Sequence, residues 1–304
     1  MTETLQGIAP ISHLGIIRVQ GDDAASFIHG QLTNDFALLD QQHARLAAFC
    51  SAKGRMQASF IGFKRAPDDI LLICSQDLLA RTLKRLSMFV LRAKAKLTDA
   101  SADFQLFGLL GLLGNAVASA EAPWTLHTQA DGSHLVQLYP AAGQPRALLV
   151  TPAGIPAPQG PALTAEQWLW TEVASGVATV SESVFELFVP QMLNYESVGG
   201  VNFKKGCYPG QEVVARSQFR GTLKRRAYIV HADQPLSAGQ DVFAASDAEQ
   251  ATGTVVQAAP APQGGWDAIA SMQIQSAQEA LTAGSPAGAA LTVQPLPYTL
   301  LEDI

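Results

Sequence analysis

Cys207 lies in the most basic stretch of the sequence, and its surroundings indicate thiol chemistry. Residues 201–226 read VNFKKGCYPGQEVVARSQFRGTLKRR and hold seven lysines and arginines against a single acid. Glycines and a proline on both sides of the thiol predict a tight loop, and neighbouring lysines favour the thiolate form of an accessible cysteine. The alternative is that Cys207 is a small buried filler and the basic residues form a solvated face.

The other two cysteines, Cys50 and Cys74, fall within apolar strand-like runs and are predicted to be core residues. Three cysteines without a C-x-x-C pair argue against a disulfide framework and against a self-contained zinc or four-thiolate iron–sulfur site. Thiol chemistry would therefore use one cysteine alone, and we predict no metal site.

The elements that position this loop mix strands and helices. Gly21-Asp22-Asp23 precede a helix with apolar residues at a 3.6-residue period, which we expect to end near residues 34–35. A second helix is expected from Ser75 or Asp77 to about Val90. The expected strands of this half are residues 13–20, 45–51, 56–63 and 70–74, the middle two joined as a hairpin by residues 52–55.

The next part repeats the mixture, which predicts the α+β class. Strands are expected at residues 104–110, 133–139 and 146–150, and a helix around 114–120. Four prolines in residues 151–161 predict an irregular surface connection. Thr164 with Gln167 forms a capping box that begins a helix reaching to about Gly176.

The charge distribution changes abruptly after Arg226. All 20 lysines and arginines precede this point, and the remaining residues carry eight acids and no basic residue. We therefore predict a body of residues 1–226, with two mixed subdomains of about residues 1–100 and 101–226, and a separate domain of residues 227–304. Only strand-like runs occur in the last part, which predicts a small antiparallel barrel.

Composition excludes several classes of protein. With 48% hydrophobic and 15% charged residues, the chain is not a disordered one. Its longest uncharged apolar region, residues 104–120, is interrupted by three glycines, so no membrane helix is predicted. The first residues lack the basic and apolar regions of a secretory signal, so the expected location is the cytoplasm.

The segment KGCYPGQE at residues 205–212, continued by Val214-Ala215-Arg216 and Arg220-Gly221, closely resembles the signature of the YgfZ family of folate-binding proteins. This family is related to the glycine-cleavage T-protein. The resemblance covers nearly the whole chain, with residues 120–160 least alike. Its other matching segments are Phe188–Gln191, Gly199-Gly200, Gly30-Gln31, Thr33–Asp35, Ala52–Met56 and Pro295–Tyr298.

The resemblance implies a T-protein-like folate-binding α+β body around a central channel, followed by a C-terminal antiparallel β-barrel. It also implies a role in assembling or repairing iron–sulfur enzymes, including those that thiolate tRNA. The implied partners are folate and iron–sulfur assembly proteins or client enzymes, with an indirect link to tRNA and none to a membrane. The working thiol would be Cys207, accompanied by Lys205, Gly206, Tyr208, Gly210, Gln211, Glu212 and Arg216.

The implied cofactor is tetrahydrofolate or a derivative. Trp168 matches a tryptophan associated with the ligand in the family, where an indole face can stack on a pterin; the alternative is a helix anchor in the core. A second family tryptophan is Leu14 here. Asn34 and Gln191 are candidate contacts to the pterin edge. The glutamate carboxylates would meet Lys205, Arg216 or Arg55, although each of these is also consistent with a surface residue.

Two positions depart from the T-protein pattern. Residues 57–59 read Gln-Ala-Ser where T-proteins carry adjacent aspartates, one of them catalytic, so aminomethyl transfer would lose about 10²–10⁴ in rate. Ala174 stands where T-proteins place a glutamate that contacts the pterin. Glu172 is rotated by about 200° from that position on a helix, so we expect it to point away from the ligand.

Three functions compete. The first is a folate-binding accessory protein whose Cys207 shares, transfers or protects a transient iron–sulfur cluster, because one thiolate cannot hold a cluster that needs about four ligands. The second is a folate-dependent C1-transfer enzyme, against which Ala58-Ser59 argues. The third is a nucleic-acid-binding module that uses residues 81–96 and 204–226, which hold 13 of the 20 basic residues but are opposed by the acidic C-terminal part.

Overall fold

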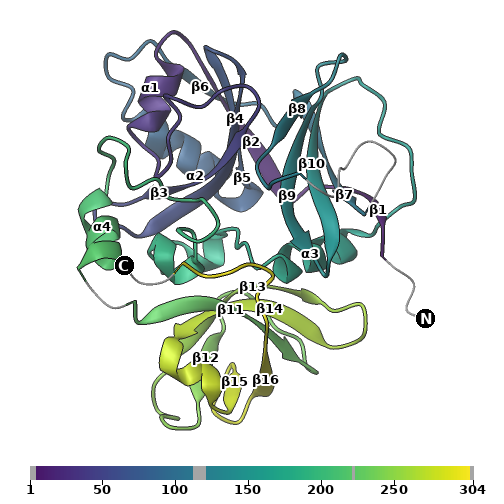
Figure 1. The fold of residues 1–304 in the computed structure, drawn as a ribbon, viewed down its shortest axis with the longest axis vertical. Coiled ribbons are helices and arrows are strands. Elements are labelled where there is room, and N and C mark those ends of the chain that lie inside the picture. The colour runs from purple at the N-terminus through teal and green to yellow at the C-terminus, as the bar shows by residue number, and fades with distance from the viewer. Residues whose placement is uncertain (1–4, 112–120, 221–222, 302–304) are drawn as a thin grey trace.

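Two five-stranded antiparallel sheets lie side by side, and a closed six-stranded barrel packs below them (Figure 1). The computed structural model describes residues 5–111, 121–220 and 223–301. The class is α+β with a C-terminal antiparallel barrel, so the predicted fold is confirmed. The helix predicted around residues 114–120 lies outside the described residues.

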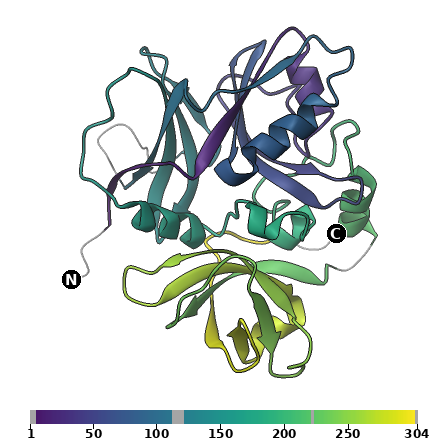
Figure 2. The ribbon, with the colours of Figure 1, turned by 180° about the vertical axis from the view of Figure 1, so that it is seen from behind.

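The first sheet comes from one continuous stretch of chain. In spatial order its strands are β3 (Ala44–Cys50), β4 (Met56–Ala66), β5 (Asp69–Ser75), β2 (Leu14–Gln20) and β6 (Lys96–Asp99). Helix α2 (Gln76–Ser87) covers its outer face, as Figure 2 shows, because its buried stripe of Leu78, Leu79, Thr82 and Leu86 faces the strands.

Helix α1 (Ala24–His29) is shorter than predicted. The expectation that it reaches residues 34–35 is wrong, since the chain leaves the helix at Gly30 and begins to pair with β3. Leu32 forms a bridge with Phe49, and the Thr33 backbone N–H donates to the Ala48 carbonyl at 3.0 Å.

The second sheet has the same strand order as the first. Its strands are, in spatial order, β8 (Leu126–Thr128), β9 (His134–Ala141), β10 (Gln144–Pro152), β7 (Phe104–Leu110) and β1 (Gly7–Pro10). Each strand from β7 to β10 takes the place that a strand from β2 to β5 takes in the first sheet. The edge position that β6 takes in the first sheet is taken in the second sheet by β1, a strand near the N-terminus. The two sheets are therefore structural repeats that the sequence does not reveal.

The proline-rich segment of residues 151–161 begins within the second sheet. Strand β10 continues through Pro152, so the first residues of the proline-rich segment belong to the sheet, and the expectation of irregular structure holds only beyond them. Helix α3 (Ala165–Ala174) follows, and both hydrogen bonds of its predicted capping box are present. It packs on the barrel strands β13 and β14 (Figure 2).

The barrel closes through the strands β11 (Arg225–Ala232), β14 (Trp266–Gln273), β13 (Gly253–Pro260), β12 (Asp241–Ala244), β15 (Leu281–Ala283) and β16 (Ala289–Gln294). Between α3 and the barrel, the chain forms the short helices η1 (Glu182–Val184) and η2 (Pro190–Leu193), then α4 (Gln211–Phe219); η3 (Ile274–Gln278) lies within the barrel. No helix of the described residues is long and apolar enough to cross a membrane.

The cores of the two sheets merge. One buried cluster joins Ile16, Phe63 and Ile73 of the first sheet to Val136 and Leu148 of the second, with Trp168 of α3 in the same cluster. Burial of such side chains contributes about 1.5–3 kcal/mol each. A cavity lies beside this shared core, between the two sheets.

Candidate functional site

A cavity partly open to solvent lies between the two sheets and beneath α3; its empty space is about 600 Å³ with the solvent at its mouth included, of which about 50 Å³ is open to the centre of a water molecule. Most of its lining is aliphatic or aromatic. Among the described residues that line it, the charged ones are Arg146 of β10 and Glu172 of α3. The cavity is thus an apolar chamber with two opposite charges in its wall.

Glu172 points into this cavity, so the prediction that it faces away is wrong. Trp168 and Glu172 are four residues apart, slightly more than one helical turn, and so they share the face of α3 that lines the cavity. The side of α3 that faces the cavity is therefore marked by Trp168 and not by position 174.

The Glu172 carboxylate is fully occupied by neighbours. Oε1 accepts from the Trp168 indole N–H and from His13 Nε2, both at 2.9 Å, and Oε2 accepts from the Gln257 amide at 2.9 Å. Burial alone would raise the pKa of Glu172, but the charge and hydrogen bond of His13, together with the charge of Arg146, lower it overall. Burial likewise opposes protonation of His13, whose pKa the hydrogen bond and charge of Glu172 nevertheless raise.

Trp168 lines the cavity and is 1% exposed. A Cβ at Gly108 would lie 2.3 Å from its ring, so the indole rests directly on the backbone of β7. The Arg146 guanidinium carbon lies 4.6 Å from its ring centroid, a cation–π contact. Trp168 is therefore both a core anchor and a cavity wall, and stacking on a pterin stays a prediction.

Arg146 is 3% exposed, and the described residues give it one hydrogen bond. Nη1 donates to the Tyr139 carbonyl at 3.3 Å, while Nε has no partner. Burial lowers the pKa of Arg146 to about 10, against the attraction of Glu172. Sequence reasoning missed this residue, although an arginine beside the apolar run 147–150 was a usable signal.

Trp124 and Tyr139 form an aromatic wall that sequence reasoning also missed. Their ring centroids are 5.9 Å apart. The Trp124 backbone is left-handed, with φ of 73°, and its indole N–H donates to the Val198 carbonyl at 3.0 Å. Its backbone also bonds Ala44 of β3 and Gln137 of β9, so it ties both sheets together at the cavity. It lies in the stretch least similar to the family, where no motif pointed to it.

The strand segment that departs from the T-protein pattern reaches the cavity through Ser59. Its hydroxyl accepts the Val180 backbone N–H at 2.9 Å. Ala58 faces the opposite side of the sheet, within the core under α1. No carboxylate from residues 57–59 lines the described cavity.

The thiol loop lies against the hairpin turn of residues 51–55. Gly210 has a φ of 81°, and a Cβ there would lie 2.4 Å from the Ser51 carbonyl oxygen. Gly54 has a φ of 70°, and a Cβ there would lie 2.9 Å from the Val213 Cβ of α4. Neither site has room for a Cβ, so the two motifs can pack together only because glycine stands at both positions. They bring Cys207 to the surface, where the thiol is exposed rather than a buried filler, while Cys50 and Cys74 are buried as predicted.

The residues around Cys207 mostly position the loop. The Lys205 ammonium donates to the carbonyls of His29 and, at 2.8 Å, Leu32, which fastens the loop to the end of α1. Burial lowers the pKa of Lys205 to about 8. Tyr208 is buried beneath it, with the ammonium 4.6 Å from its ring centroid.

The rest of the motif forms the first turns of α4. The Gln211 amide approaches the Gly206 carbonyl at 3.4 Å, and Glu212 pairs with Arg216 on the exposed face of the helix. None of the described residues 205–220 lines the cavity, so the thiol and the cavity are separate sites.

Three of the predicted folate contacts also lie away from the cavity. The Asn34 amide donates to the carbonyls of Leu46 and Gly199, both at 2.7 Å, and the Gln191 amide donates to the Val214 carbonyl at 2.7 Å. Arg55 donates to the Leu187 carbonyl at the surface. These contacts hold the loops around the site, and Trp168 is the predicted cofactor residue that the structure places at the cavity.

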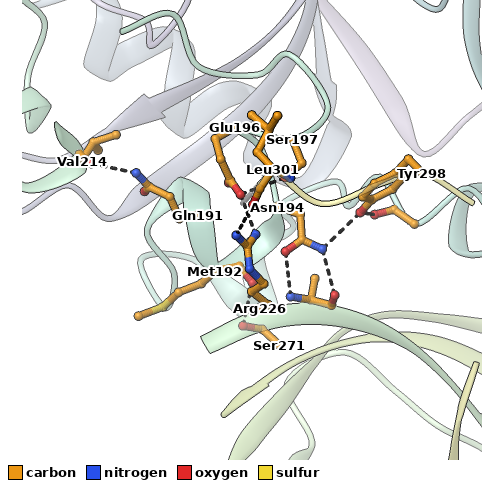
Figure 3. Close-up of polar contacts among 12 residues, drawn as sticks. Gln191, Met192, Asn194, Glu196, Ser197, Val214, Arg226, Ser271, Tyr298 and Leu301 are labelled. Atoms are coloured by element: carbon orange, nitrogen blue, oxygen red, sulfur yellow. Dashed lines mark hydrogen bonds and ion pairs between the residues drawn. The ribbon is translucent and has the colours of Figure 1, made fainter. Parts of the chain in front are cut away.

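Polar side chains join the barrel to the body, among them Tyr298 of the C-terminal matching segment (Figure 3). Asn194 Nδ2 donates to the Ala227 carbonyl at 2.8 Å, and its Oδ1 accepts the Ala227 N–H at 3.2 Å. Tyr298 Oη donates to the Gly176 carbonyl at 2.8 Å, and its ring packs on Tyr139. The buried pair of Arg226 and Glu196, at 2.6 Å, completes the junction.

A metal site was not expected, and the described residues contain no group of three or more histidine, cysteine and acidic side chains that could hold an ion.

Comparison with known proteins gives two kinds of relative. The chain is 30% identical over 301 residues to the tRNA-modifying protein YgfZ of Sodalis glossinidius, covering 94% of this chain and 91% of that protein. It is 31% identical over 303 residues to the protein of the same name from Edwardsiella ictaluri, with 93% and 89% covered. No protein-family model matches the chain.

A solved structure with a similar fold is the glycine cleavage system aminomethyltransferase T from Bartonella henselae. The TM-score is 0.68, at 15% identity, over 97% of this chain and 86% of that one. At this identity the likeness concerns the fold.

Proposed function

The chain belongs to the family of the tRNA-modifying protein YgfZ, and from this premise we propose that it binds a tetrahydrofolate derivative in its central cavity and supports iron–sulfur enzymes that modify tRNA. In this proposal Cys207 is the working thiol. The observation that carries the proposal is the separation of an apolar cavity from an exposed thiol in a basic loop.

The cavity supports folate as the ligand. Its wall holds two tryptophans and two tyrosines, whose rings suit a planar heterocycle, and one arginine as a donor. The T-protein fold supports the same class of ligand, since that fold implies a folate site.

The acid in the cavity argues against aminomethyl transfer, the alternative C1 chemistry. A general base needs a pKa near the working pH and a free oxygen within reach of the proton. The pKa of Glu172 is lowered instead, and three donors occupy its two oxygens. Ser59 supplies no replacement.

The exposed thiol supports a role with a partner. A single thiolate can share, transfer or protect a cluster only while another protein supplies the remaining ligands, of which about four are needed. We therefore propose iron–sulfur assembly proteins or client enzymes as partners.

The basic residues favour an indirect link to tRNA over direct binding. Several cations of the two basic stretches are engaged: Arg81 pairs with Glu182, Arg216 with Glu212, and Lys205 bonds backbone carbonyls. A nucleic-acid site would need such cations free for phosphates.

Complementation tests the proposal. Cells that lack their own family member receive wild type, Cys207→Ala or Cys50→Ala, and the activity of an iron–sulfur-dependent tRNA methylthiolation enzyme is measured. We expect rescue by wild type and at least a tenfold loss with Cys207→Ala, without a change in melting temperature because Cys207 is exposed. Cys50→Ala is the matched control, since it removes a buried thiol and should keep rescue at a permissive temperature.

Each result decides one part of the proposal. Rescue by Cys207→Ala would contradict the thiol role, whereas failure of a folded, folate-binding wild type would contradict the iron–sulfur role and favour C1 chemistry. Tetrahydrofolate titrated into the purified protein tests the ligand separately.

A further inference from the structure

Arg146 is a buried cation whose donors are left unused by the described residues. Its guanidinium carries five N–H donors, yet its described hydrogen bonding is the single 3.3 Å contact to Tyr139, and Nε lacks a partner. A charge buried without partners is costly, and native structures retain it where it has a use.

Glu172 is not the partner that Arg146 lacks. The two groups attract each other, but no ion pair joins them among the described residues. The carboxylate instead receives His13, Trp168 and Gln257. The negative charge of Glu172 therefore favours the charged form of Arg146 without accepting a hydrogen bond from it. The guanidinium donors remain available to a group that enters the cavity.

The neighbours of Arg146 fix its orientation. The guanidinium lies against the Trp168 ring, itself held by Glu172 and by the backbone of β7. One nitrogen is tied to the Tyr139 carbonyl, beside the aromatic wall of Trp124 and Tyr139. The donor fork is preorganised on a rigid strand rather than on a mobile surface chain.

We infer that Arg146 determines the ligand specificity of the cavity by donating hydrogen bonds to the pterin head of the folate, at its 4-oxo oxygen. This inference rests on the proposed folate function. The 4-oxo oxygen of the pterin resembles the O6 oxygen of guanine, which accepts hydrogen bonds from arginine.

The glutamate tail is the other group that an arginine could bind. Its carboxylates are strongly hydrated and costly to bury, whereas Arg146 and Trp168 are nearly inaccessible to solvent. An uncharged ring with one acceptor oxygen suits this apolar chamber, and the tail remains nearer solvent.

Three probes separate head from tail: tetrahydrofolate, 6-methyltetrahydropterin and p-aminobenzoylglutamate. Binding is measured by anaerobic calorimetry to wild type, Arg146→Gln, Arg146→Lys and, as a control, the exposed Arg85→Gln. We expect Arg146→Gln to weaken tetrahydrofolate and the pterin by a similar factor, about 10- to 100-fold, because a charge-assisted bond is lost. Binding of p-aminobenzoylglutamate and the Arg85→Gln results should stay at wild-type values.

Other outcomes overturn the inference. If Arg146→Gln weakens p-aminobenzoylglutamate but not the pterin, Arg146 reads the tail; if a folded Arg146→Gln binds all probes normally, it reads neither. Should Arg146→Gln not fold, Arg146→Lys decides, since it keeps the charge but not the fork and must still weaken the pterin. A wild type that binds none of the probes refutes the folate proposal itself, a result distinct from these.

Discussion

At the scale of single residues, Glu172 connects two spaces of the molecule. It lines the central cavity, while His13 and Gln257, which hold its carboxylate, line a groove between the body and the barrel. Any change in the protonation of His13 therefore acts on the cavity wall from outside. The pair is a structural brace for α3 and a source of pH dependence.

The His13 and Glu172 pair predicts a specific pH profile. Since the folded-state pKa of His13 is raised above 6.5, its contribution is complete below pH 6.5 and is lost as the pH rises through the raised value. The lowered pKa of Glu172 makes its contribution complete above pH 4.5 and lost as the pH falls through the lowered value. We expect His13→Gln to be less stable than wild type near pH 6 and to approach it at higher pH.

Urea unfolding of both proteins between pH 5 and 9 measures this difference. Identical slopes against pH for wild type and His13→Gln would contradict the assignment. His43→Gln is the control, because His43 pairs with Asp40 at an exposed site.

Residue types alone predicted part of the site. Cys207 and Trp168 were singled out by their match to family motifs, and the structure places the first at the surface and the second at the cavity. Arg146 and Trp124 did not, because a buried arginine is distinguished from a surface one only by what packs around it. The direction of the Glu172 side chain was predicted wrongly because position 174, rather than Trp168, served as the reference for the side of the helix that faces the cavity.

At the scale of elements, the turn of residues 51–55 and the start of α4 behave as one unit. Each presents a glycine in a left-handed conformation to the other's backbone or side chains. A side chain at either glycine would separate the two motifs and move the thiol loop.

Gly210→Ala should therefore destabilise the protein by more than about 2 kcal/mol, from backbone strain together with the clash at Ser51. Gly143→Ala is a matched control, because Gly143 has a similar φ of 74° but nothing within 4 Å of an added Cβ. The control should cost only about 1 kcal/mol, from strain alone. Equal losses in thermal unfolding would show that the close approach of the two motifs is unimportant.

The longer elements were predictable, whereas the shortest were not. Strands β2 to β5 and helices α2 and α3 show clear periodicity or caps. The short strands β1, β6, β8 and β15 have three or four residues each, too few for a period to emerge. Helix α4 was missed because Pro209 and Gly210 precede it and few of its residues are buried.

At the scale of the whole molecule, the junction in Figure 3 holds the barrel to the body through buried polar groups. The side chains of Arg226 and Glu196 are 7% and 0% exposed. The Ser271 hydroxyl of the barrel also donates to the Met192 carbonyl at 2.8 Å. Residue 226, where the positive charges end, is thus an anchor between the two parts, and the division of the chain there stays a proposal.

Arg226→Met should destabilise the protein by about 3–5 kcal/mol, because it leaves the Glu196 carboxylate buried without its main counter-charge. Adding Glu196→Gln should recover about half of this loss, since the uncompensated charge is then removed. Chemical unfolding of both variants gives the comparison. A double variant no more stable than Arg226→Met would indicate that geometry rather than charge holds the junction.

The placement of β1 has a consequence for the order in which a chain emerging from the ribosome can fold. Residues 14–99 contain every strand of the first sheet, which can assemble as soon as they are synthesised. Strand β1 is made earlier but must wait for β7, about 100 residues later, to obtain its partner. The cavity wall needs still later residues, Trp168 and Tyr195, with Gln257 behind Glu172. The cavity wall is thus complete only in a nearly complete chain.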